Sequence, residues 1–346
     1  MLGTSPDAFG GIASVIGVYY DSGIISECNI VYIATHCTGT VQKKMATLCK
    51  AWRTFTSLAF AGKIAIVHIH LACGLSFWRK SLFAAYTIFL RIPYIIHLHS
   101  GNFPNYYRDS SSPTKFIIRG VLGKASATIT VSKDLKSWLK QILKNHDAIV
   151  MHNPIYFSSI QYKYERDKSK IVFLGRIEAA KGITDLILAV QHISLRHPNI
   201  RLVIAGSGDI ATAKKMAADL GMDSKIEFPG WVAGEVKRVL LSSATLFVLP
   251  SYAEGMPMAV LEAMSHGTAV IATDVGGIPE VVHDRVDGLL VPPGDVSKLG
   301  EAIALLLSNN DMRERLGRAG QDAVRQHFSP KSTSAALLDL YAKLQS

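Results

Sequence analysis

The sequence has few cysteines, no long apolar segment and no repeated motif, and each absence excludes a class of protein. Only 4 of the 346 residues are cysteine, without a Cys-x-x-Cys pair, so we expect free thiols rather than a disulfide framework or a zinc module. The longest nearly apolar run, Leu82–Leu90, is far shorter than the roughly 18 residues of a membrane-spanning helix. No basic segment followed by an apolar one opens the chain, so we predict a cytoplasmic protein without a secretory signal.

Acidic residues are scarce in the first half of the chain. Residues 1–153 contain 16 lysines and arginines but 6 acidic residues, whereas residues 154–346 contain 21 of each kind. The formal net charge of +10 therefore lies entirely in the first half. Such a field suits a nucleic acid, an anionic membrane or a phosphorylated acceptor, although a basic surface without a partner explains it as well. No nucleic-acid-binding module is evident, so we expect no nucleic acid partner.

Strand-like apolar runs alternate with helical patterns along both halves. In the first half the predicted strands are Ile64–Ile69, Tyr94–Leu98, Ala127–Val131 and Ala148–Met151. In the second half they are Lys170–Leu174, Arg201–Ala205, Ile226–Phe228, Leu246–Leu249, Ala269–Ala272 and Gly288–Val291. The alternation implies βαβ crossovers and parallel sheets. We therefore predict an α/β protein of two doubly wound domains facing a cleft, with ligands beyond the carboxyl ends of the strands.

A polar, charged segment without periodicity separates the two halves. We interpret residues 156–170 as a linker between a first domain at 1–155 and a second domain at 171–328. Ser329-Pro330 is a helix-start signal, and apolar residues follow at helical spacing. We therefore predict a separate terminal helix at residues 329–346.

Two cations and a glycine-rich turn follow predicted strands of the second domain. Arg176 and Lys181 lie five residues apart in a loop that opens a helix, so they could hold one phosphate group together with the helix N-terminus. Gly206 follows the next strand and permits a ligand to approach the backbone closely. A solvated basic loop and a tight turn explain these segments equally well.

A pair of glutamates separated by seven residues is the most informative segment. Glu254 precedes a turn, and Glu262 lies about one and a half turns inside the following helix. Carboxylates accept hydrogen bonds from vicinal hydroxyls, so the pair suits a sugar and a ribose that flank a diphosphate. Two solvated acids near a helix start are the alternative. The backbone that would face the anion belongs to Gly255, Met256, Pro257 and Met258.

The order and spacing of these segments resemble a known enzyme family. GRIEAAKG, AGSGD, the Glu-x7-Glu segment, TDVGGIPEVV and DGLLVPPGD are similar to the retaining glycosyltransferases of family 4, which have the GT-B fold. The terminal FSPKSTSAALLDLYAKL resembles the family's last helix, which crosses back to the first domain. Pro6–Ile12 resembles its N-terminal glycine-rich loop, which includes Gly10 and Gly11. Only five residues precede Pro6, so we expect the strand before that loop to be missing or short.

The resemblance implies a role for each site residue. HIHLACGLSFWRKSLF and IIHLHSGNF resemble a subgroup that builds bacterial exopolysaccharide or O-antigen units on lipid carriers, and there His99 contacts the transferred sugar. Glu254 binds the donor sugar, Glu262 binds the ribose, and Arg176 and Lys181 stabilise the leaving diphosphate. The neighbouring strand histidines receive no role. The candidate catalytic residues are therefore His99, Arg176, Lys181 and Glu254, and the candidate donor-binding residues are Gly10, Gly11, Gly206, Gly255, Met256, Pro257, Met258 and Glu262.

The resemblance also implies a reaction. We expect transfer of a hexose from a nucleotide sugar, with retention and without a bound metal ion or cofactor, in exopolysaccharide or lipopolysaccharide synthesis. The acceptor would be a saccharide or a polyprenyl-pyrophosphate-linked saccharide. GDP and UDP donors both stay open, and mannose is favoured because the first half resembles mannosyl-transferring members. The alternatives are a sugar-nucleotide epimerase of the same architecture and an inactive basic membrane-binding scaffold.

Residues Val41–Ala59 predict a basic amphipathic helix, with Lys43 and Lys50 opposite its apolar face. Such a helix can lie on an anionic membrane, or it can cover a sheet and leave a solvated outer face. Arg79 and Lys80 form a second cationic cluster, which could receive a pyrophosphoryl-lipid acceptor. The sheet-covering alternative is slightly favoured, and the membrane alternative would make the protein peripheral on the inner face of the cell membrane.

Overall fold

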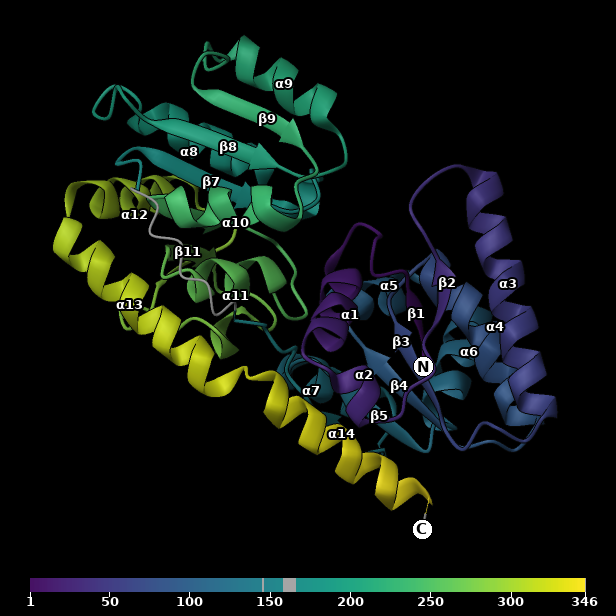
Figure 1. The fold of residues 1–346 in the computed structure, drawn as a ribbon. Coiled ribbons are helices and arrows are strands. Elements are labelled where there is room, and N and C mark those ends of the chain that lie inside the picture. Colours follow the sequence, from purple (N-terminus) through teal and green to yellow (C-terminus); the bar gives the residue numbers. More distant parts are fainter. Residues whose placement is uncertain (145, 158–165, 346) are drawn as a thin grey trace. The chain divides into compact units, whose positions relative to one another are not determined.

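The computed structural model describes residues 1–144, 146–157 and 166–345, and the chain divides into two compact units (Figure 1). Unit 1 comprises Met1–Tyr156 and Phe328–Ser346, and unit 2 comprises Phe157–His327. Each unit contains one sheet of six parallel strands, which confirms the predicted α/β class. Among the described residues, no helix is long and apolar enough to cross a membrane.

The sheet of unit 1 has the strand order β2-β1-β3-β4-β5-β6. β3 and β4 are buried along their whole length, as is typical of parallel strands that are covered on both faces. The strands are β1 (Leu2–Thr4), β2 (Ile33–His36), β3 (Val67–Leu71), β4 (Tyr94–Leu98), β5 (Ala127–Thr130) and β6 (Ala148–Val150). The helices are α1 (Gly11–Asp21), α2 (Ile24–Glu27), α3 (Val41–Phe60), α4 (Leu75–Phe89), α5 (Phe103–Asp109), α6 (Ser112–Gly123), α7 (Lys133–Ile142) and α14 (Pro330–Gln345).

The strand before the glycine-rich loop is present and short. β1 has three residues and pairs with β2 and β3 inside the sheet. The loop that follows is held at its start, because Ser5 N donates a hydrogen bond of 2.8 Å to His36 O at the end of β2. The sheet therefore positions Gly10 and Gly11 at the start of α1.

The amphipathic helix α3 covers the sheet of unit 1. Its own residues Ala51 and Phe55 are buried, and Trp52 stacks on Phe83 of α4 with ring centroids 4.1 Å apart. Val41 and Met45 at its N-terminal end and Phe60 at its C-terminal end remain exposed. Packing therefore buries the middle of the apolar face and leaves both ends of the helix exposed.

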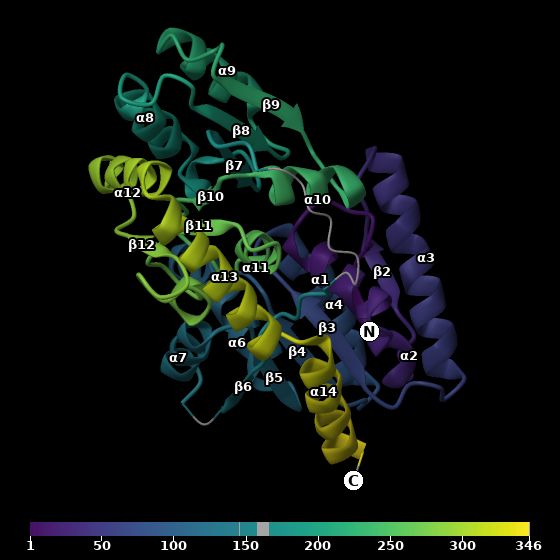
Figure 2. The same cartoon turned by 60° about the vertical axis from the view of Figure 1, so that its left-hand side comes forward.

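The terminal helix α14 belongs to unit 1, where it lies beside α2 (Figure 1 and Figure 2). Leu337 and Leu340 are buried, and the Tyr341 hydroxyl lies 2.6 Å from His68 Nδ1 of β3. Cys28 of unit 1 contacts Ser334 of α14. All four cysteines are free thiols, as the sequence predicts.

The sheet of unit 2 has the strand order β12-β11-β10-β7-β8-β9. The strands are β7 (Lys170–Leu174), β8 (Arg201–Ala205), β9 (Ile226–Gly230), β10 (Leu246–Leu249), β11 (Ala269–Thr273) and β12 (Leu289–Val291). The helices are η1 (Ala179–Lys181), α8 (Ile183–Ile193), α9 (Ile210–Asp219), α10 (Gly234–Ser243), α11 (Met258–Ser265), η2 (Ile278–Glu280), α12 (Val296–Ser308) and α13 (Asn310–His327). The crossover order brings the loops after β7, β8, β10 and β11 to one edge of the sheet.

The end of the predicted linker is part of unit 2. Residues 158–165 lie outside the described residues, but Arg166 donates hydrogen bonds to Ala244 O, His266 O and Gly267 O. Asp167 N donates to Ser243 O at 3.0 Å. These bonds anchor Arg166 and Asp167 in unit 2 before β7 begins.

Candidate functional site

The loop after β7 and the loop after β10 touch in unit 2. A Cβ atom on Gly182 would lie 2.0 Å from Pro250 O, and Gly182 has a φ of +67°. Tyr252 N donates to Ala180 O at 2.9 Å, which ties the same two loops together. Glycine is required here because the backbone conformation is left-handed and another carbonyl fills the space of a side chain. The loops that carry Lys181 and Glu254 are therefore held against each other.

Lys181 and Glu254 form an ion pair at this junction. Lys181 Nζ donates to Glu254 Oε1 at 2.6 Å, and the side chains are only 19% and 11% exposed. Ser251 Oγ donates to the same carboxylate oxygen at 2.8 Å. The structure thus brings together two predicted site residues that are 73 positions apart in the sequence. A cation and a carboxylate in this setting can bind a diphosphate and a sugar hydroxyl.

Glu262 forms a second ion pair, on α11. Lys237 Nζ of α10 donates to Glu262 Oε1 at 2.7 Å, and the two side chains are 27% and 14% exposed. A carboxylate can accept several hydrogen bonds, so Glu262 can still accept hydrogen bonds from the hydroxyl groups of a ligand.

Arg176 stands apart from these buried pairs. Its Nε lies 3.2 Å from Glu178 Oε2, and its side chain is 65% exposed. An exposed guanidinium can reorient toward an anion at little cost because water screens its present partner. The structure therefore places Arg176 on the same loop as Lys181 without placing it against Glu254.

The segment before α11 is buried, and α11 begins at Met258. The first turn of α11 contains no acidic residue, so the partial positive charge of the helix start is not neutralised within that turn. The buried members of this segment are Gly255, Met256, Pro257 and Met258.

Gly206 has a structural reason to be glycine. A Cβ atom there would lie 1.7 Å from Gly175 O, the carbonyl at the end of the neighbouring strand. Gly206 N donates to Gly230 O at 2.8 Å. Close packing of adjacent strand ends therefore explains this glycine, and its predicted contact with the donor stays a prediction.

The glycine-rich loop of unit 1 leaves open space at its end. Gly10 is the N-cap of α1 with a φ of +122°, and no atom lies within 4 Å of a Cβ placed on Gly10 or Gly11. Phe9 N donates to Thr38 Oγ1 at 3.1 Å, which holds the loop near the end of β2. Neighbouring side chains therefore do not crowd Gly10 and Gly11 at the start of α1.

His99 follows β4 and is bonded to another histidine. Its Nε2 lies 2.7 Å from Nδ1 of His70 in β3, and its ring stacks on His97 with centroids 4.2 Å apart. Burial lowers the pKa of His99 well below its ordinary value, and His97 and nearby Lys80 lower it further. His99 is therefore neutral at physiological pH. Its ring can donate and accept hydrogen bonds with a sugar, but it cannot form an ion pair.

Three of the neighbouring histidines form a group that could suit a metal ion by composition. His68, His70 and His97 are buried, and one nitrogen from each lies within 4.8 Å of the others. However, the rings of His68 and His70 are stacked at an interplanar angle of 8°, and those of His70 and His97 at 28°. Metal ligands need in-plane lone pairs that converge, about 2.0–2.1 Å from zinc for instance, and stacked rings do not provide this. The geometry gives no support for a metal centre here.

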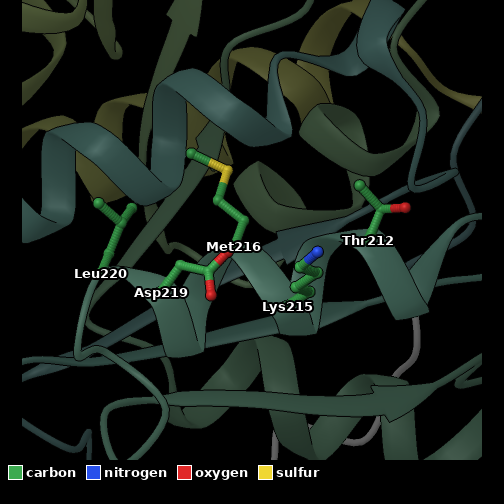
Figure 3. Close-up of a pocket in the computed structure, with 5 residues that line it drawn as sticks. All are labelled: Thr212, Lys215, Met216, Asp219 and Leu220. Carbon is green, nitrogen blue, oxygen red and sulfur yellow. The ribbon is translucent and has the colours of Figure 1, made fainter.

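Two hollows lie in the described residues. The first, of about 260 Å³, is formed by side chains of α9 and the residue after it, Thr212, Lys215, Met216, Asp219 and Leu220 (Figure 3), and it contains no predicted site residue. The second, of about 520 Å³, lies in unit 1 between the loop after β1, the strand β2 and α3. Lys43 and Lys50 line it together with Thr47 and Thr54. These lysines therefore border a cavity, whereas the sequence places them on the outer face of the helix.

Three partners were not predicted from the sequence. Lys237 lies in an ordinary charged helix, and Ser251 precedes the Glu-x7-Glu segment without a motif of its own. His70 could have been found, because His68-Ile69-His70 and His97-Leu98-His99 both show a period of two. Residues two apart share one face of a strand, and β3 and β4 pair with His70 opposite His97.

Comparisons with known proteins show the family to which the chain belongs. Residues 26–158 match the family described as Glycosyltransferase Family 4, and residues 158–323 match Glycosyl transferases group 1. An uncharacterised glycosyltransferase of Methanocaldococcus jannaschii (MJ1607) is 30% identical over 271 residues, 72% of this chain and 69% of that protein. The chain belongs to glycosyltransferase family 4. It is therefore assigned as a glycosyltransferase, as the motifs predict.

Relatives and solved structures extend over much of the chain. The phosphatidyl-myo-inositol mannosyltransferase of Mycobacterium leprae is 29% identical, over 67% of this chain and 69% of that protein. Sucrose-phosphate synthase from Thermosynechococcus elongatus has a TM-score of 0.79 at 20% identity, covering 99% and 98% of the two chains. Anabaena HepE in complex with UDP-glucose has a TM-score of 0.77 at 17% identity, covering 99% of both. These structures show that this glycosyltransferase has the predicted GT-B fold.

Proposed function

We propose that this glycosyltransferase moves a hexose from a nucleotide sugar to a lipid-linked or saccharide acceptor, with retention, in the synthesis of cell-surface polysaccharide. The observation that carries the proposal is the contact of Lys181 with Glu254 at 2.6 Å. It joins a cation suited to a diphosphate with a carboxylate suited to sugar hydroxyls. Glu262 provides a second carboxylate on the helix that starts beside Glu254.

In this proposal, the chemical task of unit 2 is to stabilise the departing nucleoside diphosphate. When the anomeric C–O bond breaks, negative charge develops on the β-phosphate. In our proposal Arg176, Lys181 and the start of α11 stabilise that charge in the transition state. Glu262 binds the ribose hydroxyls, and Glu254 and His99 bind the transferred sugar. These protein groups supply the charge stabilisation, so we expect turnover to persist in the presence of EDTA.

The identity of the donor is part of the proposal. One relative is named a phosphatidyl-myo-inositol mannosyltransferase, and one structural neighbour was solved with UDP-glucose. Both GDP-linked and UDP-linked hexoses are therefore donors to test, and we place mannose first. A thermal-shift panel of nucleotide sugars should identify the donor, since a ligand at 100 times its Kd stabilises the folded protein by about 2.7 kcal/mol.

We assign the acceptor to unit 1. The cavity of about 520 Å³ has a volume suited to a sugar and borders the loop that leads to Gly10. Lys43 and Lys50 line this cavity, and neither forms an ion pair with a described residue, so both can bind an anionic acceptor. Replacement of both lysines by glutamine should raise the KM for a pyrophosphate-linked acceptor and leave nucleotide affinity unchanged. Arg53→Gln, on the same helix but outside the cavity, is the matched control.

We also propose peripheral binding of unit 1 to anionic membranes. The net charge of +10 lies in residues 1–153, and large apolar side chains on α4 and α6 are exposed. Basic residues and exposed apolar groups together favour an anionic lipid surface. The exposed side chains are Leu75, Leu82, Phe89 and Phe116. Sedimentation with anionic vesicles should show binding that weakens with salt, and equal recovery with neutral vesicles would contradict it.

One experiment separates this proposal from an epimerase or an inactive scaffold. The purified protein is incubated with each nucleotide sugar and a saccharide or lipid-pyrophosphate acceptor, and the products are separated by mass. A product heavier than the acceptor by one hexose supports the transferase. Inversion of the donor at C2 without transfer indicates the epimerase, and an unchanged donor with every acceptor supports the scaffold.

A further inference from the structure

His70 in β3 is buried, and both of its ring nitrogens have partners. Nε2 lies 3.1 Å from the sulfur of Met1, and Nδ1 lies 2.7 Å from Nε2 of His99. A thioether sulfur has no hydrogen to donate, so this contact is a hydrogen bond only in the tautomer with the proton on Nε2 of His70, and we infer that tautomer. Burial lowers the pKa of His70 well below its ordinary value. The ring therefore holds one proton only, and its Nδ1 is an acceptor.

The protonation of His70 determines that of His99. Because Nδ1 of His70 accepts, Nε2 of His99 must donate. His99 is also neutral, so its own Nδ1 carries a lone pair. No second side chain among the described residues forms a hydrogen bond with the ring of His99, and the residue as a whole is not fully buried. Its Nδ1 is thus left as an acceptor for a ligand.

We propose that His70 is a positioning residue that fixes His99 in the Nε2–H tautomer, so that Nδ1 of His99 accepts a hydrogen bond from a hydroxyl of the transferred sugar. The tautomer itself follows from the contacts of unit 1. The role toward the sugar rests on the proposed function.

The surroundings of His99 fix the plane of its ring as well. His99 N donates to Leu71 O at 3.0 Å at the end of β3, and the ring stacks on His97 at an interplanar angle of 28°. Stacking fixes the plane of an imidazole but not the nitrogen that carries its hydrogen. The hydrogen bond to His70 is the contact that distinguishes the two tautomers.

Three variants separate the hydrogen bond from the packing. His70→Asn keeps an acceptor oxygen near the place of Nδ1, whereas His70→Leu fills the space without an acceptor. His68→Leu is the control, because His68 is buried on the same strand but bonds to Tyr341 and His97 instead of His99. Circular dichroism and the thermal midpoint establish that each variant is folded.

Nitrogen-15 NMR of ring-labelled histidine measures the tautomer without any substrate, and His99→Gln identifies the signals of His99. We expect His99 in the wild type, His70→Asn and His68→Leu to show a protonated Nε2 and an unprotonated Nδ1. In His70→Leu we expect a mixture of tautomers. A protonated Nδ1 in the wild-type protein overturns the proposal, and so does an unchanged tautomer in His70→Leu. If His70→Leu does not fold, the wild type and His70→Asn decide the matter.

Turnover of the donor tests the consequence. His70→Leu should lower kcat about tenfold, which corresponds to the loss of one hydrogen bond in the transition state. His70→Asn should recover most of kcat, and nucleoside diphosphate affinity should stay within about twofold in both. A loss of kcat as large in His68→Leu as in His70→Leu contradicts a specific positioning role. If the wild type turns over no nucleotide sugar but the tautomers behave as expected, the proposed function fails and the positioning contact stands.

Discussion

At the scale of single residues, unit 2 holds the two carboxylates of the candidate site in ion pairs. The glutamates of the Lys181–Glu254 and Lys237–Glu262 pairs are 11% and 14% exposed. Removal of one partner from a largely buried pair leaves the other charge without compensation. A substitution here should therefore affect both stability and function, and each prediction needs a control that separates the two.

Loss of the cations beside the leaving group should slow turnover. Lys181→Ala and Arg176→Ala should each lower kcat roughly 10- to 100-fold, because a hydrogen bond to a charged group contributes about 1.5–3 kcal/mol. Lys181→Ala should also lower the thermal midpoint, since Glu254 loses its partner. Lys215→Ala, an exposed lysine of α9, is the control. Wild-type rates in both folded variants would remove these residues from the leaving-group site.

Glu262 should contribute to nucleotide binding. Glu262→Ala should weaken the affinity for the cognate nucleoside diphosphate by about 1–3 kcal/mol, because a charged acceptor of ribose hydroxyls is lost. Calorimetric titration measures this, with Glu314→Ala on α13 as the control. An unchanged affinity would exclude Glu262 from the donor site.

At the scale of elements, the sequence predicted most of the strands but not β2 (Ile33–His36). The bounds of β4, β7, β8 and β10 agree with the prediction, because short, continuous apolar runs between polar residues are typical of buried parallel strands. The strand predicted at Ile64–Ile69 lies later, at Val67–Leu71. Pairing with β4 determines this register, and pairing is not visible in a local pattern.

A side-chain contact limits one of the helices. Between β11 and β12 the chain forms only the short 3-10 helix η2, Ile278–Glu280. There Asp287 accepts hydrogen bonds from both the backbone N and the ring Nδ1 of His283, which replaces the helical bond that His283 N would form. The same limit applies to the candidate site. The motif revealed Glu254 and Glu262, but tertiary contacts bring their lysine and serine partners to them, and a local pattern does not show such contacts.

Contact between the loops after β7 and β10 should depend on Gly182. Gly182→Ala places a Cβ atom 2.0 Å from Pro250 O at a φ of +67°, so it should destabilise unit 2 by more than the roughly 1 kcal/mol of backbone strain alone. Gly221 has the same φ of +67° and open space around it, so Gly221→Ala should cost only the strain. Urea denaturation of the two variants compares them directly, and equal losses would show that the loops can separate freely.

At the scale of the whole molecule, a basic unit with buried imidazoles is joined to a unit of balanced charge. Burial lowers the pKa of His97 to about 3 and lowers those of His68 and His70 well below the ordinary value. In the unfolded chain these rings bind protons near pH 6.5. Below about pH 6.5 the unfolded chain therefore binds more protons than the folded one, and the free energy of unfolding decreases.

Unit 1 should consequently lose stability between pH 7.5 and 5.5. Each buried histidine should lower the free energy of unfolding by up to about 1.4 kcal/mol per pH unit once the pH is well below 6.5. Tryptophan fluorescence in urea follows this loss, since Trp52, Trp78 and Trp138 all belong to unit 1. His68→Leu should reduce the slope. A midpoint that is constant or rises toward pH 5.5 would contradict neutral burial of these rings.

The central claim is that this family 4 enzyme transfers a hexose with retention from a nucleotide sugar bound through Lys181, Glu254 and Glu262. Proton NMR of the reaction with the donor found by thermal shift, in the presence of EDTA, tests it most directly. We predict that the anomeric signal of an α-linked donor is replaced by that of an α-linked product as the nucleoside diphosphate appears, and that Glu254→Gln slows this conversion. A β-linked product, or equal rates in the wild type and Glu254→Gln, would contradict the account.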